Sequence, residues 1–217
     1  MILSVVIPAL NAASTLPATL ESVGGSAEVI VADGGSSDGT GGVARGARVV
    51  SAPRGRGIQI AAGVAAATHP WLLLLHADTI LSGGWREAVA AHLAAGSDRA
   101  GYFRFRLDSP DSRARRLERM VAWRCRMFAL PYGDQGLLIH RDLLARIGGV
   151  QPLPLMEDVD LIRRLGRGRL VSLDADAITS AAKWERDGYL RRSARNLFCL
   201  ALWFAGAPPG VILRIYG

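Results

Sequence analysis

The sequence has almost no lysine and very little cysteine. Lys183 is the only lysine among 26 basic residues, so arginine carries the formal net charge of +7. A guanidinium group suits two-point contacts with phosphate, although arginine in place of lysine is also typical of some genomes. Cys125 and Cys199 lie far apart and outside any Cys/His cluster, which excludes a disulfide framework and a cysteine zinc site. We expect two free thiols in a reducing compartment.

Long hydrophobic runs and aromatic residues are also scarce. The longest late apolar stretch, 197–207, is shorter than the roughly 20 residues that a membrane-spanning helix needs. The first apolar run follows no basic segment and is interrupted by Pro8 and Asn11, so we expect no secretory signal and a cytoplasmic protein. Aromatic residues make up 6% of the chain and do not alternate with the arginines, which argues against a nucleic-acid partner.

The 217 residues are half hydrophobic, enough for one substantial core. Short apolar runs alternate with helical stretches, a pattern typical of a doubly wound α/β fold with a mostly parallel sheet. Strands are expected within 3–9, 27–33, 47–53, 71–78 and 101–108. Helices are expected near 14–23, 57–67, 85–95, 112–128 and 141–147.

The first two strands end in polar loops. "VVIPALNAAST", residues 5–15, predicts a buried strand that stops at Pro8, with Ser14 or Thr15 capping the next helix. The second strand ends at Asp33 and leads into "GGSSDGT", in which Asp38 or Thr40 could cap a helix. Such a loop either turns the chain or binds a ligand, since ligands of open α/β sheets lie beyond the carboxyl ends of the strands.

The third and fourth strands place charged residues at the same edge. Arg54 and Arg56 follow the third strand and either bind a pyrophosphate or are solvated loop charges. His76 and Asp78 end the fully apolar run "WLLLLHADT". Residues two apart on a strand point the same way, so this pair suits a metal or a ribose. A cap on the following helix is the alternative, although Thr79 and Ser82 are better placed for it.

Three acidic residues occur together in "PLMEDVDLIRRL". Glu157, Asp158 and Asp160 could simply favour the start of a helix, where the helix dipole attracts negative charge. The preceding Leu155 and Met156 favour instead a partly dry pocket. There the pKa of one carboxylate could rise toward that of a general base.

These segments, in this order, resemble the family 2 glycosyltransferases with a GT-A nucleotide-diphospho-sugar transferase fold. "VVIPALN" resembles the opening strand of that family, "VADGGSSDGT" its nucleotide loop, "LLHADT" its DxD-type metal motif and "MEDVDLIRRL" its acceptor segment. The resemblance covers residues 1 to about 170, with His76 standing where the family has a first aspartate. "RGRGIQIAAG", "PYGDQGLLIHRD" and "KWERDG" are similar to a bacterial arsenosugar-type, radical-SAM-associated branch.

The resemblance implies an inverting transfer of a sugar from a nucleotide-sugar, UDP-linked, to a hydroxyl acceptor. Asp158, or else Glu157, would remove the acceptor proton, and Asp78 would hold Mg²⁺ or Mn²⁺. The residues implied to bind the nucleotide are Pro8, Ala9, Asn11, Asp33, Gly34, Ser36, Arg54, Arg56, Gln59, His76 and Asp78. Those implied near the donor sugar or the acceptor are Gly133, Asp134, Gln135 and Trp184.

Two other functions remain open at this point. A nucleotidyltransferase would carry a Gly-rich, Lys-containing loop directly after the first strand, and "PALNAAST" has neither feature. A non-catalytic nucleotide-sugar-binding protein would be indicated by the loss of Asp158, which is present.

The last part of the chain is expected to be a separate helical segment. We expect residues 1–180 to form the GT-A domain and residues 181–217 a C-terminal helical extension. Its arginines and apolar residues would be covered by the domain itself, by a second subunit in a homodimer, or by the inner face of a membrane.

Overall fold

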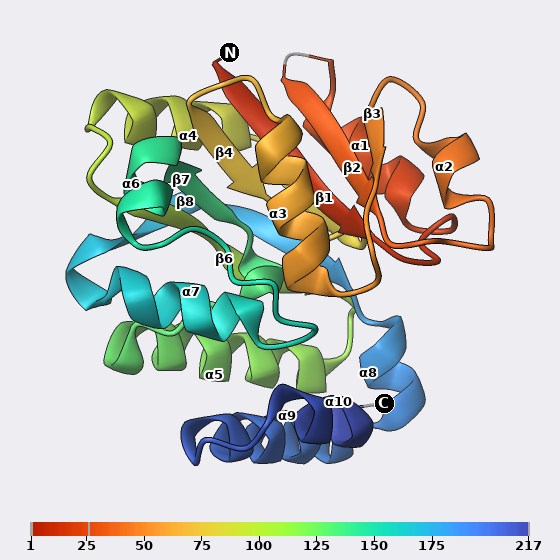
Figure 1. The fold of residues 1–217 in the computed structure, drawn as a ribbon. Helices are drawn as coiled ribbons and strands as arrows, with labels where there is room; N and C mark the ends of the chain where they lie inside the picture. The colour runs from red at the N-terminus through yellow and green to blue at the C-terminus, as the bar shows by residue number, and fades with distance from the viewer. Residues whose placement is uncertain (1, 26, 217) are drawn as a thin grey trace.

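The computed structural model, which describes residues 2–25 and 27–216, contains one eight-stranded sheet (Figure 1). The strand order is β3-β2-β1-β4-β7-β6-β8-β5. The strands are β1 (Leu3–Ala9), β2 (Glu28–Asp33), β3 (Arg48–Ser51), β4 (Trp71–Leu74), β5 (Thr79–Leu81), β6 (Ala100–Asp108), β7 (Leu137–His140) and β8 (Leu170–Ser180).

Helices cover both faces of the sheet and extend below it (Figure 1). The α-helices are α1 (Leu16–Val23), α2 (Thr40–Val43), α3 (Arg56–Ala66), α4 (Trp85–Ala94), α5 (Ser112–Phe128), α6 (Arg141–Arg146), α7 (Glu157–Leu165), α8 (Ala182–Asp187), α9 (Tyr189–Phe204) and α10 (Pro209–Tyr216). Two short 3₁₀ helices are η1 (Gly133–Gln135) and η2 (Arg167–Arg169). Within the described residues, no helix has the length and hydrophobicity that crossing a membrane requires.

The sheet is parallel in its first half and mixed in its second. β3, β2, β1 and β4 are parallel neighbours, as the alternation of strands and helices predicts. β7 runs antiparallel to both β4 and β6, β8 is parallel to β6, and β5 is antiparallel to β8. The parallel half places the carboxyl ends of β1, β2 and β4 at one edge.

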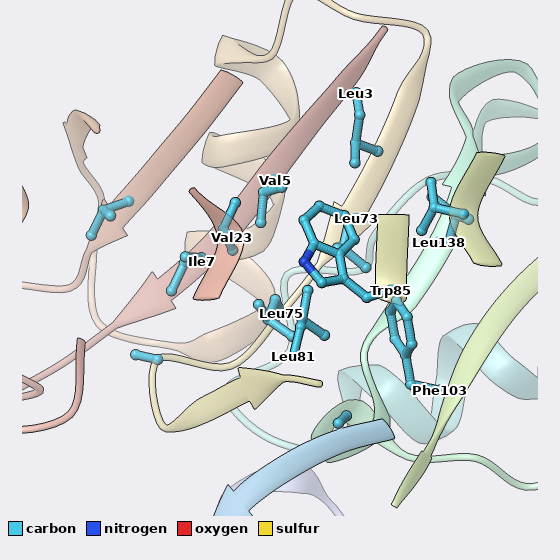
Figure 2. Close-up of a cluster of buried hydrophobic side chains, with 14 of the residues drawn as sticks. Leu3, Val5, Ile7, Val23, Leu73, Leu75, Leu81, Trp85, Phe103 and Leu138 are labelled. Atoms are coloured by element: carbon cyan, nitrogen blue, oxygen red, sulfur yellow. The ribbon is translucent and has the colours of Figure 1, made fainter. Parts of the chain in front are cut away.

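The core lies on both faces of β1, which is buried along its whole length. Leu3, Val5 and Ile7 pack with Trp85 of α4 on one face (Figure 2). Val6 packs on the other face, in a cluster that also contains residues of α3, α6 and α7. A strand buried on both faces needs a continuous apolar run, which explains the "SVVI" segment.

The side-chain cap predicted for α1 is wrong, and the one predicted for α2 takes a different form. Thr15 occupies the position before α1, but its hydroxyl makes no capping hydrogen bond. Gly39 occupies the capping position of α2 and has no side chain to cap it, but Asp38 Oδ1 accepts from the Thr40 N–H at 3.0 Å, the first N–H of that helix. The other oxygen of Asp38 and the Thr40 hydroxyl accept hydrogen bonds from the backbone of the loop after β1, at 2.9 Å in each case. The polar residues therefore join two loops.

The alternative cap after β4 is wrong as well. Gly84 precedes α4 without a side-chain capping bond. Thr79 lies in β5, where its hydroxyl is 3.0 Å from that of Thr179, and the Ser82 hydroxyl accepts from the Asp176 N–H. Both side chains hold β5 against β8.

Candidate active site

A cavity of about 450 Å³ opens at the edge where the parallel strands end. Its wall comes from the loops after β1, β3 and β4, from α3, and from the C-terminal helices α8 and α10. The predicted nucleotide-binding residues on this wall are Pro8, Asn11, Arg54, Arg56, Gln59, His76 and Asp78. The structure thus brings together residues from three separate motifs.

The loops after β1 and β2 are tied to each other by hydrogen bonds. Asn11, in a left-handed conformation with φ of 51°, accepts from the Ser37 N–H at 2.9 Å and donates its own N–H to the Ser36 hydroxyl at 2.9 Å. The Ser36 hydroxyl in turn donates to Asp33 at 2.5 Å. Among the described residues, Ala9, Asp33, Gly34 and Ser36 are not part of the cavity wall. In this structure they shape the loops behind it.

Gln59 lies on the wall but its amide group is already bonded to the backbone. It is 3% exposed, and its Nε2 donates to the carbonyls of Ala9 at 2.6 Å and Ala32 at 3.0 Å. A Cβ atom at Gly34 would lie 2.9 Å from this amide, so the close approach requires glycine. Gln59 therefore fixes the ends of β1 and β2.

Replacing Gln59 with methionine is expected to lower the free energy of unfolding by about 1–3 kcal/mol, because two buried hydrogen bonds to carbonyls are lost. Urea unfolding would measure the difference. Gln151→Met is the control, since that side chain bonds an exposed carbonyl. Equal stability of the two variants would show that the Gln59 amide does not hold the strand ends.

His76 and Asp78 lie in a loop and not on a strand, since β4 ends at Leu74. Burial and the positive charge of Arg56 lower the pKa of His76 to about 4, so its imidazole is neutral. Burial would raise the pKa of Asp78, but His76, which is charged in the acid range where Asp78 titrates, and Lys183 outweigh it and hold that pKa below its usual value. Asp78 Oδ2 lies 3.3 Å from Lys183 Nζ. Asp78 is therefore an ionised carboxylate paired with the single lysine.

Glu157 and Asp158 begin α7 and have different partners. Glu157 is buried and forms an ion pair with Arg56, while burial raises its pKa to about 7. Asp158 accepts from the Gly133 N–H at 2.8 Å and the Val159 N–H at 2.9 Å. Burial opposes its ionisation, but Arg56 and the Gly133 hydrogen bond keep the pKa of Asp158 below its usual value. The predicted rise in pKa thus falls on Glu157, and Asp158 is held ionised.

The two predicted phosphate-binding arginines are not equivalent. Arg56 is held by Glu157 and is partly buried, whereas Arg54 is exposed on the cavity wall. Of the two, only Arg54 has a guanidinium that can move toward a ligand without breaking a buried ion pair.

Asp160, the third acidic residue of this segment, points away to Arg164, with which it forms an (i, i+4) ion pair at 2.6 Å.

The segment 133–135 contacts both acidic and imidazole groups. A Cβ atom at Gly133 would lie 2.6 Å from His76 Nε2 and 3.2 Å from Asp158 Oδ2, so glycine lets these groups approach. Burial, with the nearby Asp158 and Asp78 carboxylates, raises the pKa of Asp134 to about 6. Gln135 is buried, and its Nε2 donates to the Phe103 carbonyl at 3.0 Å. Gln135 therefore supports the turn from inside.

Trp184 is not among the described residues that line the cavity. Its ring stacks on that of Tyr189, with centroids 6.0 Å apart, and the Arg192 guanidinium lies over it at 5.3 Å. The expectation that Trp184 lies near the donor sugar or the acceptor finds no support in this packing.

Sequence reasoning missed Lys183, Leu213 and Tyr216, which all line the cavity. Lys183 had a signal, because it is the only lysine and lies in the "KWERDG" stretch. Leu213 and Tyr216 belong to α10, and nothing in their local sequence distinguishes them from other apolar residues of that helix.

The residues around Asp78 offer a divalent cation one carboxylate, so its tight binding needs the phosphates of a substrate. Within residues 2–25 and 27–216, no group of three or more His, Cys, Asp or Glu side chains could hold a metal ion. Among the described residues that line the cavity, Asp78 is the one with a carboxylate side chain. Mg²⁺ and Mn²⁺ commonly bind through one or two carboxylates and substrate phosphates, which is the donor set available here.

The sheet order and the cavity at the strand ends define a GT-A nucleotide-diphospho-sugar transferase fold. The model of the family described as Glycosyl transferase family 2 matches residues 4–148, and the chain belongs to that family.

Curated relatives include uncharacterized glycosyltransferases of Mycobacterium bovis and Mycobacterium tuberculosis, each 39% identical over 98 residues. The match covers 44% of this chain and 45% of each relative, so less than half of their length is matched.

Two kinds of solved structure share the fold. Glucosyl-3-phosphoglycerate synthase from Mycobacterium tuberculosis, in complex with Mn²⁺, UDP-glucose and phosphoglyceric acid, has a TM-score of 0.59 and 22% identity over 95% of this chain and 80% of that one. TarS residues 1–349 from S. aureus has a TM-score of 0.65 and 15% identity over 100% of this chain and 69% of that one.

Proposed function

We propose that this chain is an inverting glycosyltransferase that moves a sugar from a UDP-linked donor to a hydroxyl acceptor. Membership of Glycosyl transferase family 2 supports the reaction class. The solved complex of a protein of the same fold with Mn²⁺ and UDP-glucose supports the donor and the cation. The single observation that carries the proposal is the cavity at the strand ends, where Arg54, Lys183 and Asp78 line one wall.

The donor diphosphate is negatively charged and the cavity offers matching charge. Arg54 and Lys183 lie on the wall and are exposed enough to turn toward a phosphate. Asp78 would hold Mg²⁺ or Mn²⁺, and the cation would neutralise charge on the departing diphosphate. Arg56 adds positive charge at the back of the site while Glu157 fixes its position.

Asp158 is the proposed general base. Its ionised carboxylate takes the proton of the acceptor hydroxyl as that oxygen bonds to the anomeric carbon. The bond from that carbon to the donor phosphate breaks, and its electron pair leaves with UDP. Attack from the side opposite UDP inverts the anomeric configuration. Glu157 is the weaker candidate, because taking a proton would neutralise the partner of Arg56.

Two finer assignments belong to this proposal. The stretches "RGRGIQIAAG", "PYGDQGLLIHRD" and "KWERDG" support placement in the arsenosugar-type, radical-SAM-associated branch. The last strand ends at Ser180, which supports a transferase domain of residues 1–180 and a helical extension of residues 181–217.

Product analysis tests the proposed reaction. The chain would be incubated with Mn²⁺, a panel of UDP-, GDP- and dTDP-sugars and a panel of hydroxyl acceptors. We expect UDP release and a glycoside of inverted configuration by NMR. Retained configuration would contradict single displacement. In a parallel incubation with nucleoside triphosphates and sugar phosphates, release of pyrophosphate would indicate a nucleotidyltransferase. Donor binding without any transfer to the acceptors tested would support a non-catalytic binding protein.

Lys183 offers a separate test of the charges at Asp78. In Lys183→Ala, Mn²⁺ binding without nucleotide is expected to strengthen by up to about fivefold, since an exposed ion pair contributes about 0.2–1 kcal/mol. UDP binding is expected to weaken because a phosphate partner is lost. Lys183→Arg, which keeps the charge, is the control. Electron paramagnetic resonance of free Mn²⁺ measures the first effect and calorimetry the second. Unchanged Mn²⁺ affinity would show that Lys183 does not compete with the cation.

A further inference from the structure

The two last helices present apolar side chains to solvent. We call the set of exposed apolar residues on them the C-terminal apolar surface; it consists of Leu190, Leu197, Phe198, Phe204, Val211, Leu213 and Ile215. On α9 the exposed positions 190, 194, 197, 201 and 204 follow spacings of four and three, which places them on one helix face. This face is apolar where the solvent-facing side of a surface helix is normally polar.

The opposite sides of these helices are already packed against the chain. Cys199 of α9 and Ile212 of α10 are buried with Leu155, Met156 and Val159, in and before α7. At the edge of the exposed face, the Arg163 guanidinium of α7 lies 5.0 Å from the ring centroid of Phe204, which is still half exposed. The expectation that the domain itself covers the C-terminal helices therefore accounts for one side only, and the C-terminal apolar surface is left open.

A second exposed apolar stripe lies on α5, next to α9. Met120, Trp123 and Met127, spaced by three and four, are each more than half exposed. The other side of α5 packs in a cluster with Tyr189, the first residue of α9, and the Arg113 guanidinium lies 5.1 Å from the Tyr189 ring centroid. Figure 1 shows α5, α9 and α10 together at the end of the molecule away from the N-terminus. The two stripes thus share one end of the fold.

The solvent-facing charges on α5, α9 and α10 have one sign. α9 and α10 contain no aspartate or glutamate, and the glutamate of α5, Glu118, is buried in ion pairs with Arg106 and Arg115. Exposed arginines for which the described residues supply no ion-pair partner are Arg116, Arg119, Arg126, Arg191 and Arg214. An apolar surface edged by cations matches an anionic lipid surface.

We propose that α5, α9 and α10 dock on an anionic lipid surface, with the arginines at the headgroups and Phe198, Phe204 and Trp123 at the acyl boundary. A second copy of this chain is disfavoured as the occupant, because a two-fold contact would set the same arginines against one another. The proposal does not depend on the reaction. Leu213 and Tyr216 of α10 also line the cavity, so docking brings the cavity wall to the membrane surface.

Sedimentation with vesicles tests the proposal. The full chain would be mixed with vesicles of phosphatidylcholine alone, or of phosphatidylcholine with phosphatidylglycerol, at low and high salt. We expect binding to the anionic vesicles that weakens as salt screens the charges. Leu197→Ser with Phe198→Ser is expected to lower the partition coefficient at least about tenfold. Arg191→Gln is expected to lower it by about fivefold.

Matched controls separate docking from general effects. Val49→Ser and Arg45→Gln remove an exposed apolar and an exposed basic residue near β3, and both should bind vesicles like the parent. Circular dichroism and UDP titration check that every variant is folded. Light scattering gives the mass in solution. A tight dimer that ignores vesicles, binding that is equal on neutral vesicles, or parent-like binding by the Leu197→Ser, Phe198→Ser double variant and by Arg191→Gln would each overturn the proposal.

Discussion

Asp158→Asn is expected to slow sugar transfer by about 10²- to 10⁴-fold, the usual loss when a general base is removed, while UDP binding stays nearly unchanged. This corresponds to roughly 3–5 kcal/mol of barrier. Asparagine keeps the shape of the side chain and can still accept one of the two backbone hydrogen bonds from Gly133 and Val159. It cannot take up the acceptor proton, so the loss falls on turnover. Steady-state UDP release and calorimetry measure the two quantities.

Asp160→Asn is the matched control, because that carboxylate lies on the same helix and pairs with Arg164, whereas Asp158 lines a small pocket with Gly133 and with His76, which also lines the cavity. Its turnover should stay within a few-fold of the parent. If Asp158→Asn behaves in the same way, the base lies elsewhere, and Glu157→Gln becomes the next variant to measure.

Asp78→Ala is expected to remove the metal-dependent part of UDP binding. A hydrogen-bonding or ionic contact to a charged group contributes about 1.5–3 kcal/mol, so UDP should bind about 10- to 100-fold more weakly in the presence of Mn²⁺. Without metal, UDP should bind the variant at least as tightly as the parent, because Lys183 has lost its Asp78 partner and is free to contact phosphate. Calorimetry of UDP with and without Mn²⁺ measures both values.

Asp98→Ala controls for loss of an exposed aspartate, since Asp98 pairs with Arg146 on the surface. It should titrate UDP and Mn²⁺ like the parent. If Asp78→Ala also titrates UDP and Mn²⁺ like the parent, the metal assignment is wrong. The midpoint of thermal unfolding checks separately that both variants are folded.

The sequence predicted the first half of the fold better than the second. The runs ending in "VVIPA" and "WLLLL" are apolar on both faces, and such runs have few alternatives to central parallel strands. β5 has three residues and β7 four, which is too short for a periodic pattern. Their antiparallel pairings join segments far apart in the chain, so local sequence does not determine them.

The sequence predicted where in the fold the site lies, but it predicted few of the contacts between its side chains. Polar residues after successive parallel strands must meet at one edge, so the cavity position follows from the motifs. The partners of Glu157 and Asp78 are Arg56 and Lys183, about 100 residues away in each case, and only the folded chain brings them together. Ser36 and Gln59 were predicted to touch the nucleotide, yet in the structure they bond protein groups.

Titration of UDP into the protein in the presence of Mn²⁺, with GDP, dTDP and ADP as comparisons, is the most direct measurement. We predict one saturable site with tightest binding for UDP, a strong dependence on Mn²⁺, and loss of that dependence in Asp78→Ala. Absence of binding for every nucleoside diphosphate, or equal binding with and without Mn²⁺ in parent and variant alike, would contradict the assignment of this cavity as a metal-assisted nucleotide-sugar site.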